Sequence, residues 1–383
     1  ARGIYTLIDF HQDMYNEKFN GQGFPDWAVY DDGLPNQPDV GFPGNYFTML
    51  GLQRAYDNFW NNRPGPGGFG LQTRYAAAWK HVAARMRDVP GVFGYDIMNE
   101  PFQGTSAAAC VLTGLFGCTI PDSKLQSFSN RVRSSIRSVD SQRIVFYEPY
   151  LTYDFGLGTR TRMSGSSVGF SFHPYCIALM PGSAGLPAFP PEITGQTCQA
   201  LEQLVFSNAE QQSRSIYGGN ALLATEFGAS DNLEDIERLV GLADKNLVSW
   251  QYWAWFNRDP SGDRPQEGII IDPALPPTAS NLKQAKLDVL VRPYPHAVSG
   301  TPTTIAFDRA TKQFDMSYKT ARPGAAANPA LLTEISVPVR QYPTGYSVTV
   351  SGGTVVSAPN AAVLKVQAVT GALSVTVQVQ PNP

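Results

Sequence analysis

The chain has 383 residues, of which 43% are hydrophobic and 16% charged, and its formal net charge is -3. This composition predicts a folded chain with a large core, long enough for one large domain and a smaller one, rather than a disordered chain. The slight negative charge and the lack of a dense run of Lys and Arg argue against nucleic acid as a partner. No apolar run reaches the roughly 18 residues of a bilayer-spanning helix, so none is predicted.

Six short runs of β-branched and aromatic residues predict buried parallel strands. They lie at residues 4–10, 92–98, 144–148, 168–172, 221–225 and 249–255. Apolar residues with helical spacing lie between them, in three sets: Tyr75, Trp79, Val82, Ala83 and Met86; Leu125, Phe128, Val132, Ile136 and Val139; Leu233, Ile236, Leu239, Val240 and Ala243. Strand followed by helix, repeated, predicts an α/β fold, a β/α barrel of the TIM type.

A closed barrel of this type has eight strands, whereas six are counted here and Ala1 lies directly against the first of them. The simplest hypothesis is that residues 1–292 form an N-terminally incomplete barrel domain. Its first two βα units would have been cleaved, belong to another chain or have been left out. We therefore expect a monomer, accompanied by the N-terminal barrel fragment if that was cleaved.

After Arg292-Pro293-Tyr294-Pro295 the pattern changes to short alternating runs rich in Thr, Val and Ser, without helical spacing. The runs lie at residues 303–307, 314–318, 332–337, 346–350, 363–369 and 373–379. Short alternating strands broken by Gly, Pro and Asn predict an antiparallel β-sandwich at residues 293–383. Because no exposed aromatics cluster there, we expect the sandwich to pack on the barrel rather than to bind carbohydrate.

Cysteine spacing favours two local disulfides, Cys110 with Cys118 and Cys176 with Cys198. Such bridges indicate an oxidising setting, so the protein is expected to be secreted and extracellular. Four buried thiols remain the alternative, since four cysteines allow three pairings. The histidines are scattered and no Cys-x-x-Cys or His-Glu-x-x-His motif is present, so no metal or other cofactor is predicted.

Polar residues follow the predicted strands, at the barrel end where chemistry takes place. They are His11, Asp13, Asn99, Glu100, Glu148, His173, Tyr175, Glu226, Trp253 and Trp255. Hydrolysis of a glycosidic bond needs one carboxylic acid and one carboxylate, and Glu100 and Glu226 supply this pair. Either glutamate alone is more often a solvated residue or a helix cap, so the evidence lies in their combination.

The motifs around the two glutamates identify a family. Asn99-Glu100-Pro101, His173-Pro174-Tyr175 and Thr225-Glu226-Phe227-Gly228 together resemble glycoside hydrolase family 5, a retaining β/α-barrel family. The resemblance implies that Glu100 is the acid/base and Glu226 the nucleophile. It also implies that Asn99 holds the 2-hydroxyl of the reacting sugar, that Tyr175 hydrogen-bonds the nucleophile and that His173 belongs to the substrate site.

The first segment narrows the resemblance. Asp9-Phe10-His11-Gln12-Asp13-Met14-Tyr15, with Pro25-Asp26-Trp27-Ala28, Asp32-Gly33-Leu34-Pro35 and Ala55-Tyr56-Asp57-Asn58-Phe59-Trp60, looks like the endoglycoceramidases. This likeness covers most of residues 4–290 and implies hydrolysis of glycosphingolipids between oligosaccharide and ceramide. His11 and Asp13 would then contact the sugar next to the scissile bond. For His11, a supporting hydrogen-bonded position is nearly as well favoured.

Two further features concern the substrate. Trp253 and Trp255 share the parity that would face the barrel axis, so at least one could form the platform under the sugar, with a core position as the alternative. The family resemblance implies an aromatic at the end of the last strand and so favours Trp253 as the platform. The loop at residues 177–190 is unusually apolar for a connection. It is predicted to line a lipid groove and to contact a membrane or micelle surface transiently, although packing on its own barrel explains it about as well.

Two other functions compete with glycosphingolipid hydrolysis. A soluble-polysaccharide endo-β-glucanase or mannanase would show several exposed tryptophans along an open cleft, whereas Trp27, Trp60 and Trp79 lie in apolar or helical contexts. A carbohydrate-binding protein without catalysis is disfavoured because both glutamates, Asn99 and Tyr175 are present. The prediction is therefore a retaining, double-displacement enzyme.

Overall fold

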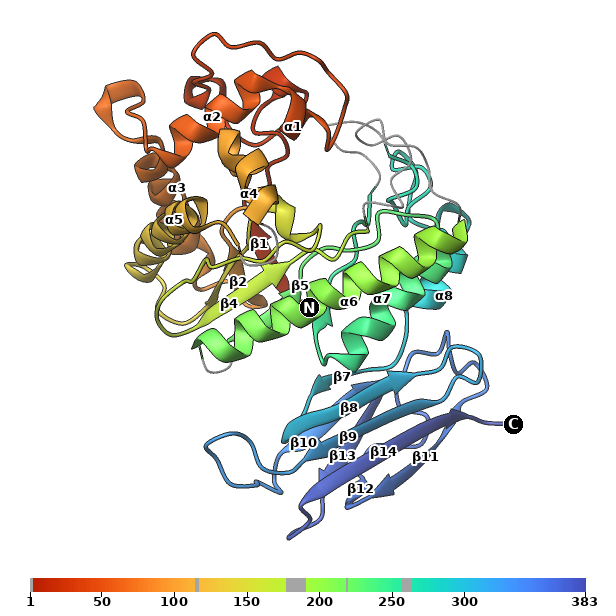
Figure 1. Ribbon diagram of the computed structural model, residues 1–383. Coiled ribbons are helices and arrows are strands. Elements are labelled where there is room, and N and C mark those ends of the chain that lie inside the picture. Colours follow the sequence, from red (N-terminus) through yellow and green to blue (C-terminus); the bar gives the residue numbers. More distant parts are fainter. Residues whose placement is uncertain (1–2, 114–116, 177–190, 218–219, 257–263) are drawn as a thin grey trace. The chain divides into compact units, whose positions relative to one another are not determined.

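The computed structural model describes residues 3–113, 117–176, 191–217, 220–256 and 264–383 (Figure 1). The chain forms two compact units: Ala1–Phe227 with Arg258–Arg264, and Gly228–Asn257 with Pro265–Pro383. Within the described ranges, no helix is both long and apolar enough to cross a bilayer.

The first unit is built on parallel strands that pair in chain order. They are β1 (Thr6–Asp9), β2 (Val92–Asp96), β3 (Ile144–Tyr147), β4 (Val168–Phe172) and β5 (Ala221–Ala224). All residues of β4 are buried, as the near-continuous apolar runs of parallel strands predict. Asp9 pairs with Asp96, and Phe172 with Ala224, so the carboxyl ends of the strands share one edge of the sheet. The predicted β/α architecture is confirmed.

Helices accompany these strands. Those of the first unit are α1 (Asn45–Thr48), α2 (Leu50–Trp60), α3 (Leu71–Met86), α4 (Ala107–Thr113), α5 (Thr119–Arg137) and α6 (Pro191–Tyr217). Single 3₁₀ turns lie at Glu17–Phe19, Asp26–Ala28, Pro66–Gly68, Gly104–Ser106 and Leu151–Tyr153. α3 packs beside α5, and α6 packs against β4 and β5. The helical spacings predicted around Trp79 and Phe128 are confirmed by α3 and α5.

An aromatic cluster anchors the segment that follows β1. The ring of Phe59 meets those of Tyr15, Phe24 and Phe128 at centroid distances of 6.4, 5.1 and 5.4 Å. Phe10 stacks on Trp79 at 4.0 Å. Each such pair contributes about 0.5–1.5 kcal/mol beyond the area that it buries. The residues between Phe10 and Tyr15, which include two predicted site residues, are therefore held at both ends.

The second unit contains α7 (Leu233–Lys245), β6 (Ser249–Trp250), a 3₁₀ turn at Ala279–Asn281, α8 (Gln284–Leu290) and two antiparallel sheets. One sheet has the order β12-β13-β10-β7 and the other β11-β14-β9-β8, drawn in blue in Figure 1. Their bounds are β7 (Tyr294–Ala297), β8 (Thr301–Phe307), β9 (Phe314–Lys319), β10 (Leu332–Ser336), β11 (Tyr346–Ser351), β12 (Gly353–Val355), β13 (Val363–Ala368) and β14 (Ser374–Pro381). The predicted sandwich is confirmed.

Strict alternation builds the core of the sandwich. Every second residue of β9, β10, β13 and β14 is buried, and Ile335 and Val366 lie fully inside. Two strands were not predicted, β7 and β12, and both are edge strands of one sheet. β7 contains Pro295 and β12 has three residues starting at Gly353, so neither carries the alternation that identifies a strand.

The sandwich packs on helices that precede it in the chain. α7 contacts both α8 and β8. Arg309 forms an ion pair with Glu237 of α7 at 2.7 Å. The side-chain amide of Gln341 donates to the carbonyl oxygens of Asp288 and Val291 at 2.9 and 2.8 Å. These buried and half-buried contacts tie the two sheets to α7 and α8.

All four cysteines are paired as predicted, Cys110 with Cys118 and Cys176 with Cys198. The Cα atoms are 5.2 and 5.3 Å apart, within the ordinary range for a disulfide. The alternative of four buried thiols is therefore wrong.

Replacing Ile335 by Ala should lower the free energy of unfolding by about 2–5 kcal/mol, because the side chain is fully buried and its removal leaves a cavity. Urea unfolding followed by far-UV circular dichroism measures the loss. Val355→Ala is the control: Val355 is 41% exposed, and its loss should cost under about 1 kcal/mol. Equal losses in the two variants would contradict this description of the core.

Candidate active site

Side chains from the ends of four strands meet at one edge of the parallel sheet. His11 and Asp13 follow β1, Asn99 and Glu100 follow β2, His173 and Tyr175 follow β4, and Glu226 follows β5. Parallel strands end at the same edge, so residues far apart in the sequence are brought together there. Seven of the nine predicted site residues lie in this group.

One nitrogen of the His173 ring lies close to both predicted catalytic carboxyl groups. Its Nδ1 is 2.8 Å from Oε1 of Glu100 and 3.6 Å from Oε2 of Glu226. The two oxygens cannot be farther apart than the sum of these distances, which suits the roughly 5–5.5 Å separation of a retaining pair. Glu100 and Glu226 therefore face one common space, as a glycosidase requires.

Glu226 is largely buried, with 12% of its side chain exposed. The hydroxyl of Tyr175 donates to its Oε2 at 3.2 Å, the bond that the family resemblance implies. Nδ1 of His11 lies 3.9 Å from its Oε1. Burial raises the pKa of Glu226 to about 7, while the positive charges of His173 and His11 oppose that rise. The carboxyl group therefore ionises near neutral pH.

His173 is buried among acceptors. Burial alone lowers its pKa, but the negative charges of Glu148, Glu226 and Glu100 outweigh burial and hold the pKa well above its usual range. Its Nε2 is 3.1 Å from Oγ1 of Thr225 and 3.5 Å from Oε1 of Glu148. A protonated imidazole donates from both nitrogens, which matches acceptors on both sides. Charge and hydrogen bonding thus both favour the protonated ring at this position.

His11 is held between two carboxylates. Its Nε2 lies 3.2 Å from Oδ2 of Asp13, and its Nδ1 lies 3.1 Å from Oδ2 of Asp9. Burial lowers the pKa of His11, but hydrogen bonds to Asp13 and Asp9 raise it well above its usual range. The hydrogen bonds to Asp9 and Asp13 match the alternative left open from the sequence, in which His11 supports the site without contacting the sugar. Sugar contact by His11 and Asp13 stays a prediction.

Asn99 is buried, and its side-chain amide donates to the carbonyl oxygen of Gln12 at 3.0 Å. Gln12 and Glu148 in turn contact the backbone of Glu100, although the sequence did not predict a site role for either. Glu148 was recognised only as a polar residue after a strand. Gln12 lies between two predicted residues, His11 and Asp13, and that position was the available signal.

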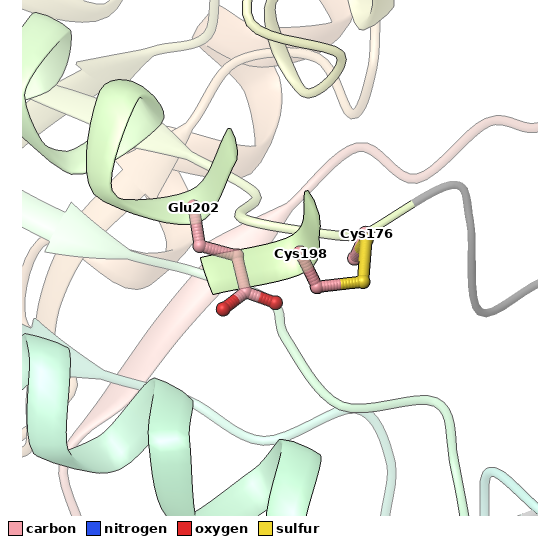
Figure 2. A group of neighbouring side chains, drawn as sticks. All are labelled: Cys176, Cys198 and Glu202. Carbon is pink, nitrogen blue, oxygen red and sulfur yellow. A yellow bond between two sulfur atoms is a disulfide. The ribbon is translucent and has the colours of Figure 1, made fainter. Parts of the chain in front are cut away.

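The disulfide between Cys176 and Cys198 joins the residue after Tyr175 to α6, and Figure 2 shows the carboxyl group of Glu202 beside it. Cys176, Cys198 and Glu202 have the spacing of a metal-binding group, but disulfide sulfurs are not thiolates and cannot act as such ligands. The bridge is therefore structural, and it fixes the chain next to Tyr175.

One other group of described residues has ligand atoms within 4.8 Å of one another: Glu100, Asp154 and His173. Carboxylate oxygens and an imidazole nitrogen are suitable ligands for a divalent cation. A cation bound there would occupy the carboxyl group of Glu100 and compete with its 2.8 Å hydrogen bond to His173. Such a cation would oppose acid/base catalysis, and the prediction of a cofactor-free enzyme stays a prediction.

Trp253 and Trp255 belong to the second unit. Nε1 of Trp253 donates to Oε2 of Glu267 at 3.0 Å, which fixes a half-buried indole, and Trp255 is 46% exposed. The platform role of Trp253 stays a prediction. The apolar loop at residues 177–190 lies outside the described residues, so the predicted lipid groove also stays a prediction.

Comparison with known proteins agrees with this arrangement. The family described as cellulase (glycosyl hydrolase family 5) matches residues 1–259, and the glycoside hydrolase family 5 C-terminal domain matches residues 292–379. Endoglycoceramidase I of Rhodococcus hoagii (strain 103S) is 29% identical, over 99% of this chain and 70% of the relative. The endoglycoceramidase of Cyanea nozakii is 26% identical, over 82% of this chain, and the chain spans only 62% of that relative.

A solved structure described as endo-glycoceramidase II from Rhodococcus sp. with ganglioside GM3 is similar, with a TM-score of 0.77 and 25% identity over 99% of this chain and 81% of that chain. The structure of its lactosyl-enzyme intermediate is also similar, with a TM-score of 0.75 and 26% identity over 99% of this chain and 80% of that chain. The family 5 match covers more than half of the 383 residues and includes both glutamates. The chain therefore belongs to glycoside hydrolase family 5, and it is a glycoside hydrolase.

Proposed function

We propose that the protein is a retaining endo-β-glycosidase that hydrolyses the bond between oligosaccharide and ceramide in glycosphingolipids, releasing intact glycan and ceramide. The observation that carries the proposal is the convergence of Glu100 and Glu226 on the ring of His173. The similarity to endoglycoceramidases, including one solved with ganglioside GM3, supports this substrate class.

The geometry supports a double displacement. Glu226 attacks the anomeric carbon while Glu100 protonates the departing ceramide oxygen, which leaves a covalent glycosyl-enzyme. Glu100 then removes a proton from water, and that water releases the glycan with its original configuration. The solved lactosyl-enzyme intermediate of the Rhodococcus enzyme supports such a covalent step.

His173 and Tyr175 prepare the nucleophile. The imidazolium charge of His173 favours the ionised form of Glu226, against the burial that raises its pKa. The hydroxyl of Tyr175 occupies Oε2 of Glu226 at 3.2 Å, so Oε1 is the oxygen left to face the sugar. One oxygen is thus fixed while the other attacks.

The protein is also proposed to be secreted and monomeric. Its two disulfides suit an oxidising, extracellular compartment. A transient contact with a membrane or micelle surface belongs to the same proposal, because ceramide is embedded in such surfaces. The apolar composition of residues 177–190 supports that contact.

Hydrolysis of a soluble β-glucan or mannan is the alternative. Such an enzyme needs exposed aromatic platforms along its cleft, but Trp60 and Trp79 are buried in the core at 6% and 0% exposure. Of the three tryptophans near the start of the chain, Trp27 alone is exposed. This observation favours the glycosphingolipid.

Incubation with a ganglioside should release free intact oligosaccharide and free ceramide, both detectable by mass spectrometry, whereas a soluble β-glucan should remain uncut. Glu226→Gln should reduce turnover by roughly 10³-fold or more, because the nucleophile is lost. Glu210→Gln is the control, since this glutamate pairs with Arg214 on the surface of α6 and its loss should leave turnover unchanged. Shortened β-glucan with untouched ganglioside would favour the alternative.

The first sugar product should carry the β configuration at its anomeric carbon, because two inversions restore the original configuration. Proton nuclear magnetic resonance during the first minutes of hydrolysis, before mutarotation, reads the configuration directly. Appearance of the α anomer first would mean a single displacement and would exclude Glu226 as nucleophile.

The rate should fall on the acidic side of neutral pH. The nucleophile must be ionised, and the pKa of Glu226 is raised to about 7, so kcat/KM for an activated aryl glycoside should drop about tenfold per pH unit below that value. His11→Asn removes a positive charge that opposes the rise in the pKa of Glu226. In this variant the fall in kcat/KM on the acidic side of the pH profile should therefore begin at a higher pH. A fall that begins at the same or a lower pH than in wild type would contradict this account.

A further inference from the structure

The backbone of Glu100 has an unusual conformation. Its φ angle is +36°, in the left-handed region that residues other than glycine rarely occupy. Such a conformation persists only where the surrounding structure imposes it, and it is found preferentially at functional sites. The contacts that impose it at Glu100 therefore bear on catalysis.

Two buried side chains bind the peptide groups of Glu100. The backbone N–H of Glu100 donates to Oε2 of Glu148 at 2.8 Å. Nε2 of Gln12 donates to the carbonyl oxygen of Glu100 at 2.9 Å and to that of Asn99 at 2.9 Å. Side chains that follow β1 and β3 thus bind the residue that follows β2, between those two strands.

Gln12 is itself fixed in one orientation. Its Oε1 accepts the hydroxyl of Tyr56 at 2.6 Å and the backbone N–H of Tyr15 at 3.0 Å. Since both donors face the oxygen, the nitrogen of the amide must face the carbonyl groups of Asn99 and Glu100. Both Gln12 and Tyr56 are buried, so no solvent competes for these bonds.

Glu148 acts at two points. Its Oε2 binds the main chain of Glu100, and its Oε1 lies 3.5 Å from Nε2 of His173. The other nitrogen of that ring binds the carboxyl group of Glu100 at 2.8 Å. One buried carboxyl group therefore constrains both the backbone and, through the ring, the side chain of the acid/base.

We propose that Glu148 and Gln12 are positioning residues for the acid/base, which hold the Glu100 peptide in its left-handed conformation and so aim its carboxyl group at the departing oxygen. The inference rests on the proposed function. A general acid must lie within hydrogen-bond reach of the atom that it protonates, so a peptide that relaxes to negative φ would carry the carboxyl group out of reach. Nucleophilic attack by Glu226 does not require that alignment.

The test compares two lactosides with different leaving groups. Protonation is essential for an alkyl β-lactoside but not for 2,4-dinitrophenyl β-lactoside, whose leaving group departs unaided. Glu148→Ala should lower turnover of the alkyl lactoside by about 10²-fold or more, while the first, glycosylating step on the dinitrophenyl lactoside stays within about threefold of wild type. Azide should raise turnover of the dinitrophenyl lactoside by this variant, because the anion attacks the glycosyl-enzyme without a base.

The conservative variant Glu148→Gln keeps an oxygen that can accept from the N–H of Glu100 but turns its NH2 group toward Nε2 of His173, so it should recover only part of the alkyl lactoside turnover that Glu148→Ala loses. Gln12→Met keeps the volume but removes both bonds to the carbonyl groups, and it should show the same leaving-group selectivity as Glu148→Ala. This second variant decides the question if Glu148→Ala does not fold.

Asp122→Ala is the matched control. Asp122 is also a buried carboxyl group that accepts backbone N–H groups, from Cys118 and Arg160, both at 2.9 Å. Its loss should lower the melting temperature and change turnover of both lactosides by the same factor. If Glu148→Ala and Gln12→Met behave in this way, without azide rescue, the positioning role is overturned. If wild type cleaves neither lactoside, the proposed function itself fails.

Discussion

A buried imidazole ring surrounded by carboxyl groups is the interaction on which the rest of this site depends. His173 lies against Glu100, Glu148 and Glu226. Removing several carboxylates from water is costly unless positive charge and hydrogen bonds compensate for the loss of hydration. The ring provides both, and because its Nδ1 contacts Oε1 of Glu100 at 2.8 Å and Oε2 of Glu226 at 3.6 Å, it also limits the spacing between these two carboxyl groups. That spacing separates double displacement from single displacement.

The parallel sheet explains how such a cluster assembles. Regular pairing ends where each strand ends, and the chain beyond is held by side chains as well as by a few backbone hydrogen bonds, such as that from the N–H of Asn99 to the carbonyl oxygen of Phe10. Gln12 and Glu148 bind the peptide after β2 in this way. The ring of Phe10, which directly follows β1, stacks on that of Trp79 and so immobilises the start of this chain segment. The polar site therefore depends on apolar packing as well as on its own hydrogen bonds.

Short motifs and residue alternation made the catalytic pair and most of the strands predictable from the sequence. The two glutamates stand in short motifs directly after apolar runs, and alternation identified the inner strands of the sandwich. Gln12 and Glu148 were missed as site residues because their partners are backbone atoms 88 and 48 positions away, and side-chain patterns do not record such contacts. The edge strands containing Pro295 and Gly353 were missed because they lack a pattern of their own.

The bond between Cys176 and Cys198 has a consequence for the integrity of the site. Tyr175, which binds the nucleophile, is adjacent to one of these cysteines, and α6 carries the other. A protease that cut the main chain anywhere between the two cysteines would leave two fragments that stay covalently joined. Under oxidising conditions the tyrosine would then remain tethered to the helix that packs on β4 and β5, so a single nick need not dismantle the catalytic apparatus.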